Sequence, residues 1–205
     1  MIPTNHAGVG DRSTTVPKPG ASAPWLAAET TTTDTTAPAQ RPGMITVDRM
    51  AAVDRNAEAL GVSERQLMES AGNAVARAVR RAADPGAAVA LVCGRGNNGG
   101  DAFVAARFLD GYDVTVHLLG RPETIGTDIA RENWAALTAA DFDTRVVRDS
   151  RALALDDPDV VVDALLGTGV TGALRQPERA AAEAINGTAA TVVAVDVPSG
   201  VDADS

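Results

Sequence analysis

The feature that most constrains the fold of this chain is a regular alternation of short apolar runs with segments of helical spacing. The apolar runs are AVALVC (88–93), VTVHLL (114–119), TRVV (144–147), DVVVDALLG (159–167) and TVVAVDVPSG (191–200). Helical segments follow the first run as far as Leu109, cover 129–139, and extend from Pro177 to Gly187. Apolar strands that alternate with helices are typical of a parallel sheet covered on both faces. We therefore predict an α/β fold with a mainly parallel sheet.

Two further helices are predicted before the first strand. Residues 47–60, VDRMAAVDRNAEAL, have apolar side chains at helical spacing, and Gly61 ends the pattern. Ser63 and Gln66 form a capping box that begins the second helix. One face of that helix carries Leu67, Ala71, Val75, Ala78 and Val79.

Residues 1–43 differ in composition from the rest of the chain. They hold six of the 11 prolines and the low-complexity run ETTTTDTTAPAQRPG. Such a segment buries too little apolar surface to offset the entropy of ordering. We predict a disordered leader over 1–43 and one domain over 44–205. Two alternatives are that the true start is Met44, or that the leader binds a partner.

Composition disfavours several classes of function. The 205 residues carry a net charge of −9, with one lysine against seventeen arginines. An acidic surface disfavours sequence-independent nucleic-acid binding, which depends on basic contacts to phosphates. No apolar run is long enough to span a membrane, and the N-terminus lacks the pattern of a secretion signal. We expect a cytoplasmic protein that binds neither nucleic acid nor membrane.

Thiol and imidazole metal sites are also disfavoured. Cys93 is the only cysteine, so neither a disulfide nor a cysteine-based zinc site can form within the chain. The two histidines, His6 and His117, lie far apart in the sequence. His117 stands inside the apolar run of the second strand, where a sheet residue is expected rather than a metal ligand.

Unusual polar residues follow the predicted strands rather than precede them. NNGGD follows AVALVC, Asp163 and the loop GTGVTG end the run 159–167, and Asp196 with Ser199 ends the last strand. In open parallel sheets, ligands bind in the crevice beyond the carboxyl ends of the strands. We therefore expect three loops from separate strands to converge on one site.

The first loop permits two interpretations. Gly94, Gly96 and Gly99 have the GxGxxG spacing of a dinucleotide-binding turn, which lets the backbone approach a phosphate before a helix. A conventional NAD site also places an acid after the second strand to bind ribose, but this strand ends in Gly120-Arg121. The glycine spacing is therefore a weak signal, and Asp101 after it could simply interact with the helix dipole.

The acids at the strand ends also permit two interpretations. An ionised Asp163 or Asp196 within an apolar run is costly unless it meets a cation or several hydrogen-bond donors. With asparagines and a serine nearby, these oxygens favour a hard cation over zinc. A buried structural hydrogen bond is the alternative. The second glycine-rich loop, 167–173, suits either nucleotide binding or simple loop flexibility.

Taken together and in this order, GRGNNGGDAFVAARFL, DALLGTGVTG and VVAVDVPSGVDAD resemble the NAD(P)H-hydrate epimerase family, as does the upstream segment RMAAVDRNAEALGVSERQLMESAG. The resemblance runs from about Met44 to Ser205. It implies a three-layer α/β/α, Rossmann-like fold and an isomerase. The implied reaction interconverts the R and S forms of hydrated NADH or NADPH, so that an S-specific dehydratase can repair both.

The resemblance also assigns site residues. It implies substrate binding by Asn97, Asn98, Gly99, Gly100, Asp101, Gly167, Thr168, Gly169, Val170, Thr171, Gly172, Ala173 and Asp196. It implies potassium as cofactor, with Asn98, Asp163 and Ser199 as ligands. For the catalytic acid and base, our hypothesis is Asp196 first and Asp101 second, because the chemistry needs a group that can both give and take a proton. Ala173 departs from the polar or acidic residue that the family often has there.

Partners and alternatives follow from the same resemblance. The implied partner is an ADP- or ATP-dependent dehydratase, which many relatives carry fused downstream. We expect the domain over 44–205 to be truncated at its C-terminus; one interpretation is that the chain is a fragment of such a longer protein, and a homodimer is one expected assembly. One alternative is an inactive chain that only binds a nucleotide or a partner. Another is a nicotinamide-dependent oxidoreductase, which Gly120-Arg121 disfavours.

Overall fold

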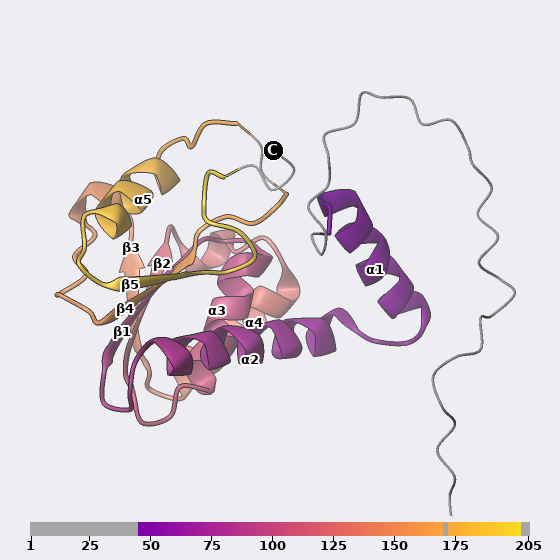
Figure 1. Ribbon diagram of the computed structural model, residues 1–205, viewed down its shortest axis with the longest axis horizontal. Coiled ribbons are helices and arrows are strands. Elements are labelled where there is room, and N and C mark those ends of the chain that lie inside the picture. The colour runs from indigo at the N-terminus through magenta and orange to yellow at the C-terminus, as the bar shows by residue number, and fades with distance from the viewer. Residues whose placement is uncertain (1–44, 170–171, 202–205) are drawn as a thin grey trace, which may run out of the picture. The chain divides into compact units, whose positions relative to one another are not determined.

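The computed structural model describes residues 45–169 and 172–201, where a five-stranded sheet lies between helices on both faces (Figure 1). The strands are β1 (Ala88–Cys93), β2 (Asp113–Leu119), β3 (Asp143–Val147), β4 (Val160–Ala164) and β5 (Thr191–Ala194). The helices are α1 (Val47–Ala59), α2 (Glu64–Ala82), α3 (Asn97–Arg107), α4 (Asp128–Ala139) and α5 (Glu178–Asn186), with short 3-10 turns η1 (Pro122–Thr124) and η2 (Ser150–Ala152). The predicted three-layer α/β/α fold is confirmed. The predicted leader, residues 1–43, lies outside the described residues.

All strand pairs are parallel, in the order β3-β2-β1-β4-β5. The chain moves outward from β1 to β3 and then returns to β4 on the other side of β1. The direction of winding therefore reverses between β1 and β4, which is where open α/β sheets bind ligands. The loops after β1, β4 and β5 all lie at the carboxyl edge beside this point.

The central strands are buried on both faces because alternate side chains enter two cores. Val89 and Leu91 belong to the larger core, which α2, α3 and α4 complete on one face. Ala90 and Val92 belong to the smaller core on the other face, which α5 covers with Ile185. This two-sided burial explains why the strands read as continuous apolar runs rather than as alternating patterns.

Helix α2 fixes the position of α3 through close backbone approach. A Cβ on Gly72 would lie 2.4 Å from Val104 Cβ, and a Cβ on Gly100 would lie 2.7 Å from Met68 Cε. The predicted capping box begins α2, since the Gln66 amide donates to Ser63 Oγ and the Ser63 amide donates to Gln66 Oε1. The start of α3, which carries the NNGGD motif, is therefore held from one side by a well-capped helix.

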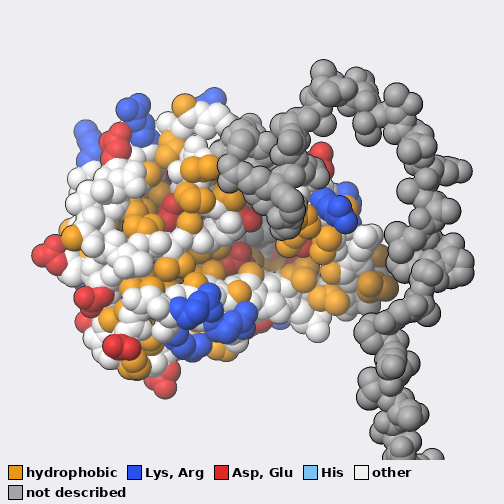
Figure 2. Space-filling model, in the orientation of Figure 1, with side chains coloured by type: hydrophobic (Ala, Val, Ile, Leu, Met, Phe, Trp, Pro, Cys, Tyr) orange, Lys and Arg blue, Asp and Glu red, His pale blue; other side chains and the backbone are white. Residues whose placement is uncertain are grey.

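Surface features away from the strand tips include basic side chains over the C-terminal half of α2, seen in Figure 2. Its last turn holds Arg80 and Arg81, where positive charge favours a helix C-terminus. Helix α1 is formed as predicted, but none of its residues is buried: Met50 is 45% exposed and Val53 is 47% exposed. Among the described residues, no helix is long and apolar enough to cross a membrane.

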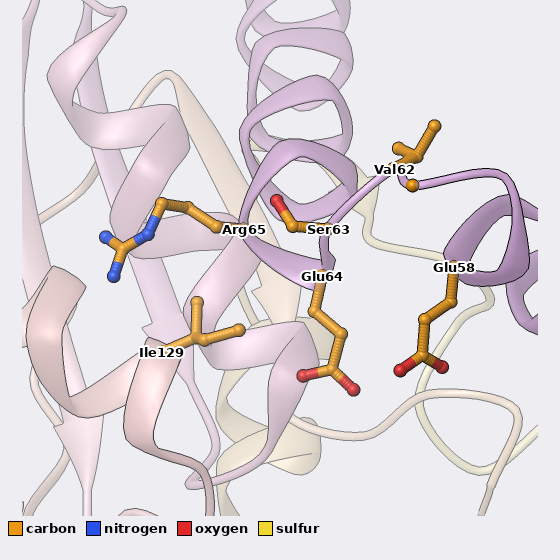
Figure 3. Close-up of a pocket in the computed structure, with 7 residues that line it drawn as sticks. Glu58, Val62, Ser63, Glu64, Arg65 and Ile129 are labelled. Carbon is orange, nitrogen blue, oxygen red and sulfur yellow. The ribbon is translucent and has the colours of Figure 1, made fainter.

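An open hollow of about 500 Å³ lies where α1 joins α2, and Figure 3 shows the side chains around it. Its lining residues are Glu58, Gly61, Val62, Ser63, Glu64, Arg65 and Ile129. The hollow therefore contains none of the residues that the sequence analysis assigned to substrate, catalysis or potassium.

Candidate active site

The NNGGD motif forms the first turns of α3, with Gly96 as the residue before the helix. The motif was predicted to be a loop before the helix; that boundary was wrong, because the helix begins at Asn97. The reason is that glycines here serve close approach rather than loop flexibility. A Cβ on Gly94 would lie 2.0 Å from Leu165 O, and one on Gly99 would lie 2.1 Å from Gly94 O.

Asn98 joins the three loops that were predicted to converge. Its Nδ2 donates to the carbonyl oxygen of Leu166 at 2.8 Å and to that of Val195 at 3.0 Å. Leu166 follows β4, and Val195 follows β5, whereas Asn98 follows β1. One amide group therefore ties the carboxyl ends of all three strands together, and the predicted convergence is confirmed.

Asp163 and Ser199 form a second link between the loops after β4 and β5. Asp163 Oδ1 accepts from Ser199 Oγ at 2.7 Å and from the Leu165 amide at 3.3 Å, while Oδ2 accepts from the Ser199 amide at 2.9 Å. The aspartate is only 7% exposed. These donors are the structural hydrogen bonds that the sequence analysis offered as the alternative to a cation partner.

Asp196 stands at the turn directly beyond β5. Its backbone is left-handed, with φ at 65°, and its side chain is exposed. Its Oδ2 accepts a hydrogen bond from the Thr168 amide at 2.9 Å. The carboxylate is thus held against the second glycine-rich loop while it remains accessible to a ligand.

Asp101 faces the same region from α3. Burial, and then the negative charge of Asp196, raise the pKa of Asp101 to about 7. The first turn of α3 contains no acidic residue, so Asp101 lies too far along the helix to interact strongly with its N-terminal dipole. The site therefore combines a carboxyl group that retains its proton near neutral pH with a second, exposed carboxyl group.

Gly167 brings the second glycine-rich loop against both groups. A Cβ there would lie 2.6 Å from Asn98 Oδ1 and 2.9 Å from Asp196 Oδ2. A Cβ on Gly169 would meet nothing within 4 Å. Farther along the loop, Gly172 and Ala173 are exposed. The two remaining predicted substrate residues, Val170 and Thr171, lie outside the described residues.

The loop after β2 also contacts the site, which the sequence analysis missed. Thr127 Oγ1 donates to Asn97 Oδ1 at 2.8 Å, and the Gly126 amide donates to the Arg95 carbonyl at 2.7 Å. The available signal was the sheet order itself, because the loop after β2 must lie beside the loop after β1 when these strands are neighbours. His117, expected to be a sheet residue, is buried in β2.

The oxygens at this site suit a hard cation of low charge. Asn98 Oδ1 makes no hydrogen bond within the described part of the chain, whereas the amide nitrogen of the same side chain donates to both carbonyls. The Asp163 carboxylate and Ser199 Oγ lie in the neighbouring contact between the loops after β4 and β5. Within residues 45–169 and 172–201, no three His, Cys, Asp or Glu side chains form a metal-binding group. The donor set is therefore one of neutral oxygens with a single buried carboxylate.

The known proteins that resemble this chain in sequence agree with one another. Residues 64–205 match the family described as YjeF-related protein N-terminus. The "Bifunctional NAD(P)H-hydrate repair enzyme Nnr" of Methanothermobacter thermautotrophicus is 52% identical over 163 residues, which are 76% of this chain and 31% of that protein. The "NAD(P)H-hydrate epimerase" of Cenarchaeum symbiosum is 42% identical over 77% of this chain and 75% of that protein.

A solved structure supports the same relationship. The crystal structure of yeast ynu0 superposes with a TM-score of 0.65 at 27% sequence identity, covering 77% of this chain and 71% of that chain. This chain spans about a third of the length of the bifunctional relatives. With its strand-tip motifs brought together and most of its length matched, the chain belongs to the YjeF-related N-terminal family, which includes the NAD(P)H-hydrate epimerases.

Proposed function

We propose that this chain is an isomerase that interconverts the R and S forms of hydrated NADH and NADPH. The observation that carries the proposal is the pair of carboxyl groups, Asp101 and Asp196, beside a motif that binds three strand-end loops together. The names of two relatives, a bifunctional repair enzyme and an epimerase, agree with this activity.

The chemistry explains why two carboxyl groups are useful. The hydrate carries a hydroxyl on the carbon next to the ring nitrogen, so the nitrogen lone pair can expel that hydroxyl once it is protonated. The planar iminium ion that results can be attacked by water on either face. The reaction thus needs a proton donor for the leaving hydroxyl and an acceptor for the proton of the incoming water.

The two aspartates differ in the way these roles require. Asp196 is our first candidate, because it is exposed and oriented by the Thr168 amide. Asp101 is the second, because it is half-buried and its pKa is raised to about 7, so that it can donate a proton at neutral pH. We assign proton donation to Asp101 and proton acceptance to Asp196 in one direction, with the roles exchanged in the other.

The residues at the loop junction fit a potassium ion. Oxygens of Asn98, Asp163 and Ser199 would hold it, and its positive charge would offset the buried carboxylate and keep the loops together. Selective stabilisation tests this assignment without an activity assay: at equal ionic strength, the melting temperature should be higher in KCl than in NaCl or choline chloride. Asp163→Asn should abolish that difference, and equal melting temperatures of the unaltered protein in all three salts would contradict the assignment.

The remaining expectations are proposals of the same kind. We propose that the chain works with an S-specific dehydratase that uses ADP or ATP, and that it does so in the cytoplasm, where NADH and NADPH are abundant. A homodimer is the assembly we propose to look for by sedimentation.

A coupled assay tests the activity. Purified R-hydrate is incubated with an S-specific dehydratase, and the return of NADPH absorbance is followed with and without this protein. The protein should accelerate the return, and Asp196→Asn should lower the rate at least 100-fold, as expected for the loss of a general acid or base. Asp110→Asn, which makes the same chemical change at an exposed position just beyond the end of α3, should retain the rate. A chain that binds NADP⁺ but never accelerates the return would instead be the inactive binding protein.

A further inference from the structure

A row of arginines follows the strands on the other side of the winding reversal. Arg95 comes two residues after β1, Arg121 two residues after β2, and Arg148 directly after β3. These three strands are neighbours in the sheet, so the arginines begin at the same edge about 5 Å apart from strand to strand. All three residues are exposed. The same loops also carry Glu123 and Asp149, of which Asp149 is paired with Arg151.

The row is continuous with the candidate active site. The Gly126 amide donates to the Arg95 carbonyl, and Thr127 donates to Asn97 of the NNGGD motif, so the loop that begins with Arg121 borders the motif. The side chain of Arg95 packs over Gly120, where a Cβ would lie 2.8 Å from Arg95 Cδ. A nucleotide bound at the motif can extend across the strand ends either toward β4 or toward β2. In the second case it lies against these arginines.

Two of the three arginines have no acidic partner in the described ranges. Arg95 lies 3.7 Å from Glu178, a loose ion pair. Neither Arg121 nor Arg148 makes an ion pair with any side chain of residues 45–169 or 172–201. An unpaired guanidinium at a strand tip is suited to a phosphate, because it offers several donors in a fixed plane.

The position of Arg121 indicates which phosphate group of a dinucleotide these arginines would bind. In α/β dinucleotide sites, the residue after the second strand meets the adenosine ribose: an acid binds the free 2′-hydroxyl, and an arginine accommodates a 2′-phosphate. Resting on the proposed function, we propose that Arg121 and Arg148 bind the 2′-phosphate of the adenosine ribose, so that this site prefers hydrated NADPH to hydrated NADH. The absence of a ribose-binding acidic residue after β2 is then explained by this preference for a phosphorylated ribose.

Binding of nucleotide fragments tests the proposal without turnover. By calorimetry, the protein should bind 2′,5′-ADP about tenfold or more tightly than 5′-AMP, the range expected for hydrogen bonds between charged groups. The preference should weaken as salt is raised. Arg121→Gln and Arg148→Gln should each reduce the affinity for 2′,5′-ADP severalfold, and the double variant should bind both fragments equally, with the affinity for 5′-AMP unchanged.

A matched control separates a specific contact from general charge. Arg81→Gln removes the same charge from an exposed position at the end of α2, just before β1 and hence near the opposite edge of the sheet. It should leave both affinities unchanged. Equal binding of the two fragments by the unaltered protein, or a double variant that weakens 5′-AMP as much as 2′,5′-ADP, would overturn the proposal. Because the coupled assay measures epimerisation separately from fragment binding, a failure here leaves the proposed activity standing, and the reverse also holds.

Discussion

Replacing Asp101 with asparagine should stabilise the folded protein at pH 8 and change its stability little near pH 4. Burial and the charge of Asp196 raise the pKa of this carboxyl from 3.8 to about 7. Between these values the folded state keeps a proton that the unfolded chain has released. The stability contributed by this group is therefore full below about pH 4 and is lost as the pH rises to about 7. Asparagine cannot ionise, so the variant should escape that loss.

The size of the effect follows from the difference between the two pKa values. One pH unit corresponds to 1.36 kcal/mol, so a rise from 3.8 to about 7 corresponds to at most about 4 kcal/mol. Asp101 is only half-buried, and solvent screens part of the interaction. We therefore expect Asp101→Asn to gain about 1–2 kcal/mol over the unaltered protein at pH 8.

Urea denaturation at pH 4.5, 6 and 8 measures the effect, with the fluorescence of the buried Trp134 as one probe of unfolding. Asp110→Asn removes an exposed carboxyl just beyond the end of α3 and corrects for the change in net charge. Asp196→Asn should flatten the pH dependence only in part, because burial is the larger cause of the raised pKa. If Asp101→Asn and the unaltered protein differ by the same free energy at pH 4.5 and pH 8, the reasoning is refuted.

Three further predictions concern packing. Gly167→Ala should lower epimerisation at least tenfold and the free energy of unfolding by about 1–3 kcal/mol, because its Cβ would lie 2.6 Å from Asn98 Oδ1, whereas Gly187→Ala, at the exposed end of α5, should leave the rate of epimerisation unchanged. Gly72→Ala should lower the free energy of unfolding by about 1–3 kcal/mol, as its Cβ would meet Val104; a variant with an unchanged urea midpoint would contradict the packing described. Cys93 is buried and its pKa is raised by that burial, so it should react with a thiol reagent only at the rate of unfolding; fast labelling of the native protein would contradict this.

The strands were predictable because burial on both faces leaves a simple signal in the sequence. Val160, Val161 and Val162 all enter a core, on alternating faces, so the run is apolar at every position. The start of α3 was not predictable in the same way. Asn98 and the glycines around it have weak helix propensity, yet they are helical because the turn is fixed from outside, by close contacts of Gly94 and Gly99 and by the hydrogen bonds of Asn98.

The site was predicted as a set of strand-end residues, and its connections were not. A parallel sheet brings such residues to one edge, which sequence order alone implies. That Asn98 donates to two carbonyls depends on where the backbones of Leu166 and Val195 pass, and no residue type at those positions records it. The contribution of Thr127 was missed for the same reason, because it acts from a loop whose sequence, GRPETIGT, carries no motif.

The glycine spacing that first suggested a dinucleotide turn has a different physical cause. Gly94 and Gly99 are required because other parts of the same chain occupy the space of their side chains, at 2.0 Å and 2.1 Å. Gly96 meets nothing within 4 Å, so the described chain gives no steric reason for it. Two of the three glycines therefore allow Asn98 to lie close to the loops after β4 and β5. The GxGxxG pattern here records how tightly three strand ends are joined, and the specificity that we propose rests on the carboxyl groups and arginines around that junction.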